Sequence, residues 1–510
     1  MLLATCASGA LASGSAQAQI AWAPCGDSND FACGHLTVSL DPTDQGSTGT
    51  TQGVITLAMH RHRSPVGEAK DAVIALAGGP GQAAIPLASQ FAQVLGPIVA
   101  TRDLIVFDQR GTGLSHPLSC PAFEHLGSNG PSPGAVAICA GQIGEAREHY
   151  TTAETVADVE AIRQAGGYEK LVLYGTSYGT KVAERYAQAY PSHVEALVLD
   201  PVVPPDGPDP LDRSTFAAIP RVLRELCGFR ACAHITRDPV GDLARLVGRM
   251  RHGPLRGRVR AVHGAVHTLS ITSNDLLGIL IEGDLDPSLR AGFPAAVHSA
   301  LSDRTTALAR LLAQAESESE GEPESLAEGF DWPLYFTTTC EETLFPFDRS
   351  ASPSRRLREA IAQIVAAPAS SFAPFTAPNA FALSDIPVCS RWPYLTPASA
   401  VDKAPLPSVP TLILSGADDL RTPTSNAQVL AAEIPGSHLL VVPNTGHSVL
   451  GSDLTSCAHD ALEALFANRP IRACPKAPPP PYLRPTPLAA EAARIVMPAA
   501  SRRSGKLPIT

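Results

Sequence analysis

The sequence is poor in charged residues, long apolar runs and metal-binding patterns, and each scarcity argues against a class of protein. Only 17% of its 510 residues are charged, and 39 Lys and Arg against 49 Asp and Glu give a net charge of −10, which would repel nucleic acid. After residues 1–19, no apolar run approaches the roughly 20 residues that span a bilayer, so we expect no stable membrane insertion. A hydrophobic content of 44% predicts a globular core, and 40 Gly and 47 Pro predict many loops.

Metal ions and cofactors are not expected either. The sequence contains neither an HExxH motif nor a CxxC pair. The glycines of Gly78-Gly79-Pro80-Gly81 are not followed by the Lys and Ser or Thr that a phosphate-binding loop needs. Any chemistry is therefore predicted to come from side chains alone.

Cysteine usage indicates where the protein works. Eleven cysteines without CxxC spacing are typical of an exported protein with disulfides. Residues 1–19 are small, apolar and uncharged, and Ala16-Gln17-Ala18 has the small-x-small form of a signal-peptidase site, so we expect a signal peptide or its remnant there. The alternative, a lipoprotein site at Cys6, would lie very near the start. We expect the protein to be secreted or periplasmic.

The ten cysteines after Cys6 lie in neighbouring pairs along the chain. We expect them to staple loops, although the sequence alone leaves other connectivities open. The predicted pairs are Cys25–Cys33, Cys120–Cys139, Cys227–Cys232, Cys340–Cys389 and Cys457–Cys474.

Short apolar runs rich in β-formers alternate with longer amphipathic stretches. This pattern predicts an α/β fold with a mostly parallel sheet flanked by helices. The predicted strands are 53–60, 71–77, 103–108, 170–175, 194–200, 411–416 and 438–443. The predicted helices of this part are 152–164, 180–190 and 453–468.

A Pro-rich stretch after Asp200 interrupts the alternation and indicates a boundary. We predict a first core part over 20–205, a mostly helical cap over 206–387 and a second core part over 388–475. The cap contains a basic stretch, 245–260, which we expect on the surface. Residues 476–510 are expected to form a Pro-rich tail.

Gly175-Thr176-Ser177-Tyr178-Gly179 lies between a predicted strand and a predicted helix, which is the context of a nucleophile elbow. The turn is so tight that only glycine fits beside Ser177, and its strained backbone exposes the hydroxyl. Ser177 is therefore the candidate nucleophile.

Serine needs a base and an orienting acid, and the chain order Ser, Asp, His is that of α/β-hydrolases. Two later loops follow predicted strands and supply such groups. His447 is the candidate base, and either Asp418 or Asp419 is the candidate acid.

An oxyanion in such a site is stabilised by two backbone N–H groups. One is expected from Tyr178, directly after the nucleophile, and the other from Gly79 in the glycine loop at 77–81.

These segments together resemble secreted α/β-hydrolases of the proline iminopeptidase and tripeptidyl aminopeptidase family. The resemblance extends over AGGPGQ (77–82), FDQRGTGLS (107–115), YPSHVEALVLDPV (190–202) and a TAP-like segment from about Cys389 to Cys474. It implies that Asp419, three residues before Thr422-Pro423, is the catalytic acid. Ala77 differs from the His that iminopeptidases often carry there.

The resemblance also implies a substrate-binding role for Glu342, with Glu341 as second candidate. In aminopeptidases of this type, carboxylates hold the free α-ammonium of the substrate, because a desolvated cation requires an opposite charge. A surface or capping glutamate is the alternative interpretation.

We therefore expect a secreted serine aminopeptidase that releases N-terminal amino acids or short peptides from peptides with a free N-terminus. A carboxylesterase or other acyl hydrolase with the same triad is the alternative, because related folds change their chemistry through their caps. A non-catalytic binding or scaffold protein is a third hypothesis.

Overall fold

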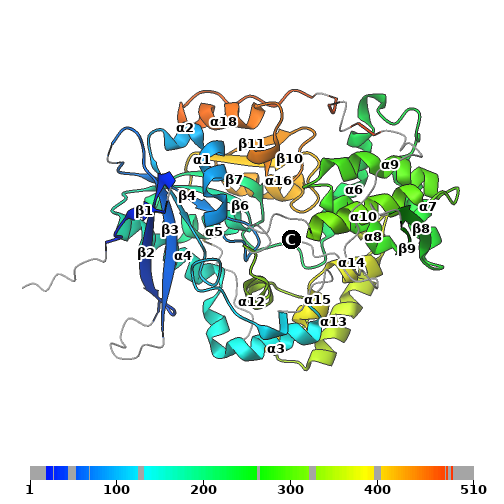
Figure 1. Ribbon diagram of the computed structural model, residues 1–510, viewed down its shortest axis with the longest axis horizontal. Helices are drawn as coiled ribbons and strands as arrows, with labels where there is room; N and C mark the ends of the chain where they lie inside the picture. Colours follow the sequence, from blue (N-terminus) through cyan, green and yellow to red (C-terminus); the bar gives the residue numbers. More distant parts are fainter. Residues whose placement is uncertain are drawn as a thin grey trace, which may run out of the picture.

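The computed structural model contains one nine-stranded sheet that carries helices on both faces, with a large helical region beside it (Figure 1). Its strand order is β1-β2-β3-β5-β4-β6-β7-β10-β11, with antiparallel pairing from β1 to β5 and parallel pairing from β5 to β11. The mostly parallel sheet confirms the predicted fold class. The structure describes residues 19–26, 28–43, 53–67, 69–123, 131–260, 265–320, 329–395, 404–476, 478–480 and 484–485.

All the predicted strands are present, with ends that differ from the prediction by at most two residues. Two strands at the sheet's antiparallel edge, β1 and β2, were not predicted. The strands of the large sheet are β1 Ala23–Cys25, β2 Ser28–Ser39, β3 Val54–His62, β4 Ala72–Leu76, β5 Asp103–Phe107, β6 Leu171–Ser177, β7 Val194–Val202, β10 Thr411–Gly416 and β11 His438–Val442.

The central strands are buried on both faces, which explains their continuous apolar sequence. Along β4, Ile74 packs into one hydrophobic core and Val73 into the other. The first core is covered by α4 Thr152–Gly166, α5 Tyr178–Ala189 and α16 Thr424–Glu433. The second is covered by α1 Ala88–Val94, α2 Gly96–Val99, α17 Val449–Ser452 and α18 Cys457–Phe466.

Local signals fix the helices that flank the nucleophile strand. Thr151 and Glu154 form a capping box at the start of α4, and Gly167 ends this helix in a left-handed conformation. Helix α5 ends at Ala189, before Pro191. The helix predicted at 152–164 is therefore confirmed, and α5 begins two residues earlier than predicted.

The region between β7 and β10, which we call the inserted region (213–389), has a hydrophobic core of its own. Helix α3, Pro133–Ile143, packs against α12 and α15 of this region. The inserted region comprises α6 Arg213–Leu226, α7 Pro239–Met250, β8 Leu255–Arg260, β9 Val266–Ile271, α8 Ser273–Glu282, α9 Pro287–Ala300, α10 Thr306–Glu320, α12 Trp332–Glu342, α13 Pro353–Ala366, α14 Ala377–Leu383 and α15 Ile386–Cys389.

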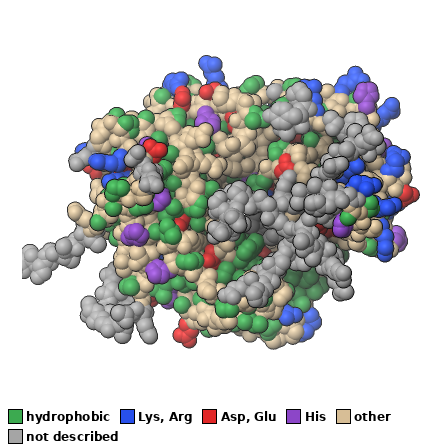
Figure 2. Space-filling model, in the orientation of Figure 1, with side chains coloured by type: hydrophobic (Ala, Val, Ile, Leu, Met, Phe, Trp, Pro, Cys, Tyr) green, Lys and Arg blue, Asp and Glu red, His purple; other side chains and the backbone are tan. Residues whose placement is uncertain are grey.

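The inserted region is mostly helical, as predicted, but its hairpin of β8 and β9 was not predicted. Arg256, Arg258 and Arg260 are exposed along β8, while Val259 between them is buried, which is the period of two that identifies a strand. Figure 2 shows Lys and Arg side chains over this end of the molecule, so the basic stretch lies at the surface as expected.

Five disulfides connect the cysteines in the predicted neighbouring pairs: Cys25–Cys33, Cys120–Cys139, Cys227–Cys232, Cys340–Cys389 and Cys457–Cys474. Within the described residues, only Cys25, Cys33 and His60 form a cluster of three potential metal ligands, and its two cysteines are bonded to each other. No helix in the described ranges is long and apolar enough to cross a bilayer. Residues 1–18 of the predicted signal peptide and most of the predicted tail lie outside the described residues.

Helix α5 buries a carboxyl group that should reduce stability at neutral pH. Glu184 is 0% exposed, and neither of its carboxyl oxygens has a hydrogen-bond partner among the residues described. Burial raises the pKa of Glu184 well above its usual value. The folded state therefore binds this proton more tightly than the unfolded state, and the free energy of unfolding falls as pH rises above the unfolded pKa.

We expect Glu184→Met to increase the free energy of unfolding by about 1–3 kcal/mol at pH 7.5, because it removes an unpaired buried polar group. The gain should be smaller at pH 5, where the wild-type carboxyl is more fully protonated. Thermal unfolding at both pH values measures the difference, with Glu169→Met at an exposed position as the control. An equal gain at both pH values would show that packing, rather than ionisation, is responsible.

Candidate active site

Ser177 lies at a strained turn where β6 ends and α5 begins. Its backbone has φ +52° and ψ −120°, a conformation that non-glycine residues rarely adopt. A Cβ at Gly175 would lie 2.5 Å from the carbonyl oxygen of Gly179, and a Cβ at Gly179 would lie 2.2 Å from that of Leu76. The two glycines are therefore required for the close approach of strand and helix around Ser177.

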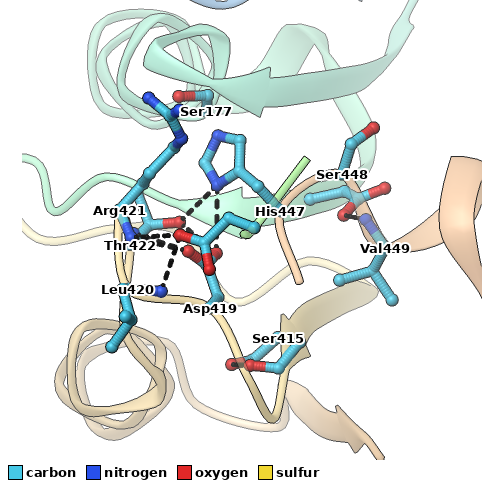
Figure 3. A network of polar contacts seen from close by, with 12 residues as sticks. Ser177, Ser415, Asp419, Leu420, Arg421, Thr422, His447, Ser448 and Val449 are labelled. Atoms are coloured by element: carbon cyan, nitrogen blue, oxygen red, sulfur yellow. Dashed lines mark hydrogen bonds and ion pairs between the residues drawn. The ribbon is translucent and has the colours of Figure 1, made fainter. Parts of the chain in front are cut away.

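His447 and Asp419 come together from the loops that follow β11 and β10 (Figure 3). The His447 Nδ1 atom lies 3.0 Å from Asp419 Oδ2, and the Asp419 side chain is 0% exposed. The backbone N–H groups of Arg421 and Thr422 donate to Asp419 Oδ1 over 2.8 and 3.0 Å, and the Thr422 hydroxyl donates to Oδ2 over 2.6 Å. Every oxygen of this carboxylate is thus engaged.

These contacts keep the Asp419 carboxylate ionised. Burial alone would raise its pKa, but the charge and hydrogen bond of His447, together with the hydrogen bonds from Thr422, outweigh burial and lower the pKa to about 2. An ionised acid in this position fixes the imidazole with its Nδ1 proton toward Asp419. The other ring nitrogen is then the basic one.

Asp418, the other candidate acid, occupies a different environment. Its backbone N–H donates to the carbonyl of Thr445 over 2.9 Å, and burial raises the pKa of its carboxyl group. No contact between this carboxyl and His447 is formed in the described structure. Asp419 is therefore the aspartate that the fold brings to the imidazole.

Figure 3 shows Ser177 on the side of the imidazole ring away from Asp419, so that the ring lies between the two. Three segments that are far apart in the sequence thus meet at the carboxyl ends of the parallel strands β6, β10 and β11. This is the arrangement of a nucleophile, a base and an orienting acid.

Two further aspartates, which the sequence analysis did not identify, hold the loops of this site. Asp200 in β7 accepts the backbone N–H groups of Val449 and Leu450, two and three residues after His447, over 2.6 and 2.8 Å. Asp284 of the inserted region accepts the N–H groups of Leu420 and Arg421 over 2.9 and 3.0 Å.

Asp284 also contacts the histidine loop. Its backbone carbonyl accepts the N–H of His447 over 3.2 Å, and a Cβ at Gly446 would lie 2.3 Å from that carbonyl oxygen. Arg290 forms a buried ion pair with the Asp284 carboxylate. One residue of the inserted region therefore supports the loops of both Asp419 and His447.

The glycine loop after β4 lies against Ser177. A Cβ at Gly78 would lie 3.2 Å from the Cβ of Ser177, and Gly79 has φ +105°, which favours glycine. Gly79 lines the same cavity as Ser177. Tyr178 is the first residue of α5, where backbone N–H groups have no acceptor within the helix. Backbone donors of both segments are thus available beside Ser177.

Ser177 opens into a cavity of about 220 Å³ between the sheet and the inserted region. Aromatic residues of α12 form one wall, with Trp332 and Phe336 stacked 6.0 Å apart and Tyr335 edge-on to both. The cavity therefore combines apolar surface with a small number of polar groups, which is typical of ligand pockets.

Two carboxylates line this cavity: Asp212, directly before the inserted region, and Asp385 within it. Asp212 precedes α6 with a left-handed backbone, φ +52°, and its side chain makes no capping hydrogen bond. Tyr335 donates its hydroxyl proton to Asp385 over 3.1 Å. Burial, followed by the charges of Asp385 and Asp209, raises the pKa of Asp212 to about 8. Among the described residues, no cationic side chain forms an ion pair with Asp212.

The sequence analysis missed this pair. The only signal was the run of aspartates in the Pro-rich stretch after β7, interpreted there as a boundary, and no motif marks Asp385.

Glu342 and Glu341, the residues predicted to bind substrate, both have partners within the protein, and the cavity that Glu342 lines is shared with Gly79, Tyr178 and Asp385. The Glu342 carboxylate forms an ion pair with Lys181 and accepts hydrogen bonds from Thr152, beside a smaller cavity of about 100 Å³. Glu341 accepts a hydrogen bond from Trp392 over 2.6 Å and lies 3.4 Å from Arg147, away from both cavities. The prediction for Glu341 does not fit this geometry, and the charge of Glu342 is already balanced by Lys181.

The comparisons with known proteins agree with this architecture. The chain matches the family described as alpha/beta hydrolase fold over residues 71–227 and the family described as TAP-like protein over residues 373–473. The first match contains Ser177, and the second contains Asp419 and His447.

Similar proteins include serine protease Hip1 of Mycobacterium tuberculosis, 26% identical over 482 residues that cover 84% of this chain and 85% of that protein. Tripeptidyl aminopeptidase of Streptomyces lividans is 31% identical over 37% of this chain and 39% of its own length. Among solved structures, proline iminopeptidase of Mycobacterium smegmatis aligns with 81% of this chain and 95% of its own at 15% identity and a TM-score of 0.38. The chain belongs to the α/β-hydrolase family, in the group of proline iminopeptidases and tripeptidyl aminopeptidases with a TAP-like C-terminal segment.

Proposed function

We propose that this protein is a serine aminopeptidase that releases N-terminal amino acids or short peptides. The observation that carries the proposal is a cavity in which Ser177 faces two carboxylates, Asp212 and Asp385. A nucleophile cleaves an acyl bond, and carboxylates that line the same cavity can bind a free ammonium. Peptidase relatives support the same conclusion.

Catalysis would begin when the Ser177 hydroxyl attacks the carbonyl carbon of the substrate. His447 takes the hydroxyl proton at the ring nitrogen that faces away from Asp419 and later gives it to the departing amine. Asp419 keeps the imidazole oriented and stabilises the imidazolium through the 3.0 Å contact with Nδ1. Water then hydrolyses the acyl-enzyme by the reverse sequence of proton transfers.

The oxyanion that forms at the carbonyl would be held by the backbone N–H groups of Gly79 and Tyr178. Both segments lie beside Ser177. Donors that are fixed before the reaction stabilise developing charge without reorganisation, and such groups often supply the largest share of catalysis.

The free α-ammonium of the substrate would lie between Asp212 and Asp385. This assignment replaces Glu342 and Glu341, whose carboxylates have other partners. A cation near Asp212 lowers the pKa of about 8 that burial and like charge impose, so the bound ammonium ionises the carboxyl. Tyr335 fixes Asp385 through its hydroxyl.

We further propose that 20–205 and 388–475 form one catalytic core and that 206–387 forms a cap that limits access to the cavity. Lining residues from the cap, such as Tyr335 and Asp385, support this division. The five disulfides support export of the protein to the medium or periplasm.

Hydrolysis of matched anilides tests the proposal. We expect anilides with a free N-terminus to be cleaved at least about 100-fold faster than their N-acetylated counterparts, because acetylation removes the cation that Asp212 and Asp385 would bind. A series from one to three residues identifies the length that is released. Short-chain nitrophenyl esters form the second arm: activity confined to esters, or indifferent to acetylation, would instead establish a carboxylesterase.

Asp212→Asn and Asp385→Asn should each raise KM for the free-amine anilide about 10- to 100-fold and leave ester hydrolysis within a few fold. For wild type, kcat/KM should increase from pH 6 toward pH 8, because Asp212 must be ionised to bind the cation. Asp206→Asn, a 68% exposed aspartate in the same Pro-rich stretch, is the matched control. Equal losses on amine and ester substrates would exclude ammonium binding by these residues.

A further inference from the structure

Arg421 is a buried cation with unused donors. Its side chain is 5% exposed, and Nη2 donates to Glu282 Oε1 over 3.0 Å. The Nε and Nη1 atoms are buried and have no hydrogen-bond partner within the described ranges. A buried donor on a charged group that lacks an acceptor is costly, so such groups are normally paired.

The guanidinium belongs to the same cavity as the nucleophile. Arg421 and Ser177 both line it, and Figure 3 shows the Arg421 side chain extending toward Ser177. The backbone of Arg421 is fixed independently, since its N–H donates to Asp284 and Asp419. The side chain is thus held at one wall of the cavity by Glu282, with two nitrogens left for a ligand.

Carboxylate is the group that such donors complement. Charge-assisted hydrogen bonds from guanidinium to carboxylate are shorter and stronger than neutral ones. In the proposed aminopeptidase the substrate's ammonium is taken by Asp212 and Asp385, in the same cavity. The remaining formal charge of a short peptide is that of a carboxylate.

We propose that Arg421 binds a carboxylate of the substrate, so that the cavity selects short peptides with both an ammonium and a carboxylate. The proposal rests on the proposed aminopeptidase function. The carboxylate is either the free C-terminus of the peptide or the side chain of an acidic residue, and substrates distinguish these two sources.

The experiment compares wild type with Arg421→Met, which removes the charge and retains the backbone N–H. Four short peptides with a free N-terminus are used: a free acid, its C-terminal amide, and the amide with Glu or Gln at the last position. We expect wild type to cleave the free acid about 10- to 100-fold faster than its amide, measured as kcat/KM. Arg421→Met should reduce this ratio to about one, mainly by slowing the free acid.

The two sources give different patterns. If an acidic side chain is the preferred group, the Glu amide is cleaved faster than the Gln amide, and this preference is lost in Arg421→Met. Arg224→Met, which removes the same charge from an exposed position of α6, should preserve every ratio. Arg421→Lys should retain part of the preference, because it keeps a charge without the planar donors.

Two results would overturn the proposal: a wild-type enzyme that shows no preference either for the free acid over its amide or for the Glu amide over the Gln amide, or an Arg421→Met variant that slows all four peptides equally, as a purely structural role predicts. The amide substrates in free and N-acetylated form report separately on the proposed function. If neither amide is cleaved while nitrophenyl esters are, the aminopeptidase assignment fails, whatever the acid preference is.

Discussion

Ser177→Ala is expected to lower kcat by roughly 10⁵-fold or more on every substrate that the protein hydrolyses, because no other group can form the acyl-enzyme. The loss should appear in kcat, with KM nearly unchanged, since the cavity walls stay in place. Alanine at position 177 would adopt the same positive φ that serine has there. The substitution therefore adds no new backbone strain, and folding should be preserved. Purified protein with unchanged thermal unfolding is therefore the material for the assay.

Ser384→Ala is the matched control, because Ser384 lines the same cavity and its hydroxyl donates to the carbonyl of Phe381 over 3.1 Å. It should keep activity within about threefold. A fluorophosphonate should label wild type and Ser384→Ala at Ser177, and should fail to label Ser177→Ala. Labelling of Ser177→Ala, or full activity in that variant, would disprove Ser177 as the nucleophile. A wild-type protein that is neither labelled nor active would instead favour a binding or scaffold protein.

The parallel part of the sheet could be predicted because its signals are local. The run LVLY (171–174) at the start of β6 is apolar and buried, and it is followed by a turn in which only glycine fits at 175 and 179. The disulfide pairs were predictable because each joins neighbours in the sequence. The order Ser, Asp, His along the chain then indicated Ser177 as the nucleophile, Asp418 or Asp419 as the acid and His447 as the base.

Local signals did not reveal the hairpins or the acidic pair. Strand β2 contains Gly34 and polar residues, and β8 alternates arginine with small or apolar residues, so neither forms an apolar run. Asp212 and Asp385 are 173 residues apart in the sequence and meet only because the inserted region folds over the sheet. Asp284 reaches the loops of the site by the same route.

The predicted role of Glu342 depended on resemblance, which placed the residue near the site but could not show its partner. Lys181, one turn into α5, forms the ion pair that balances its charge. Whether a buried carboxylate is available to a ligand depends on cations from other elements, and sequence spacing does not report these. The unused donors of Arg421 are the converse case: the sequence around it gave no signal, whereas its Nε and Nη1 atoms have no hydrogen-bond partner among the described residues.

Asp419→Asn should lower kcat by about 10³- to 10⁴-fold. The carboxylate accepts from His447 Nδ1 and three further donors from the next residues of its own loop. An asparagine can still accept with its oxygen, but its NH₂ group would face either the imidazole or the loop's own N–H groups. The imidazole then loses its orienting acceptor or takes the wrong tautomer, and the nitrogen that faces Ser177 is no longer a base.

Asp418→Asn is the matched control for this prediction, because it also replaces a carboxylate by an amide, at the neighbouring aspartate. Asp418 is 9% exposed as a whole residue, and its carboxyl makes no contact with His447 within the described residues, so activity should stay within about threefold of wild type. Rates for both variants on one anilide and one ester, with thermal unfolding as the check on folding, give the comparison. If Asp418→Asn is the variant that loses activity and Asp419→Asn retains it, the acid assigned by the 3.0 Å contact is wrong, and the histidine loop must rearrange when substrate binds.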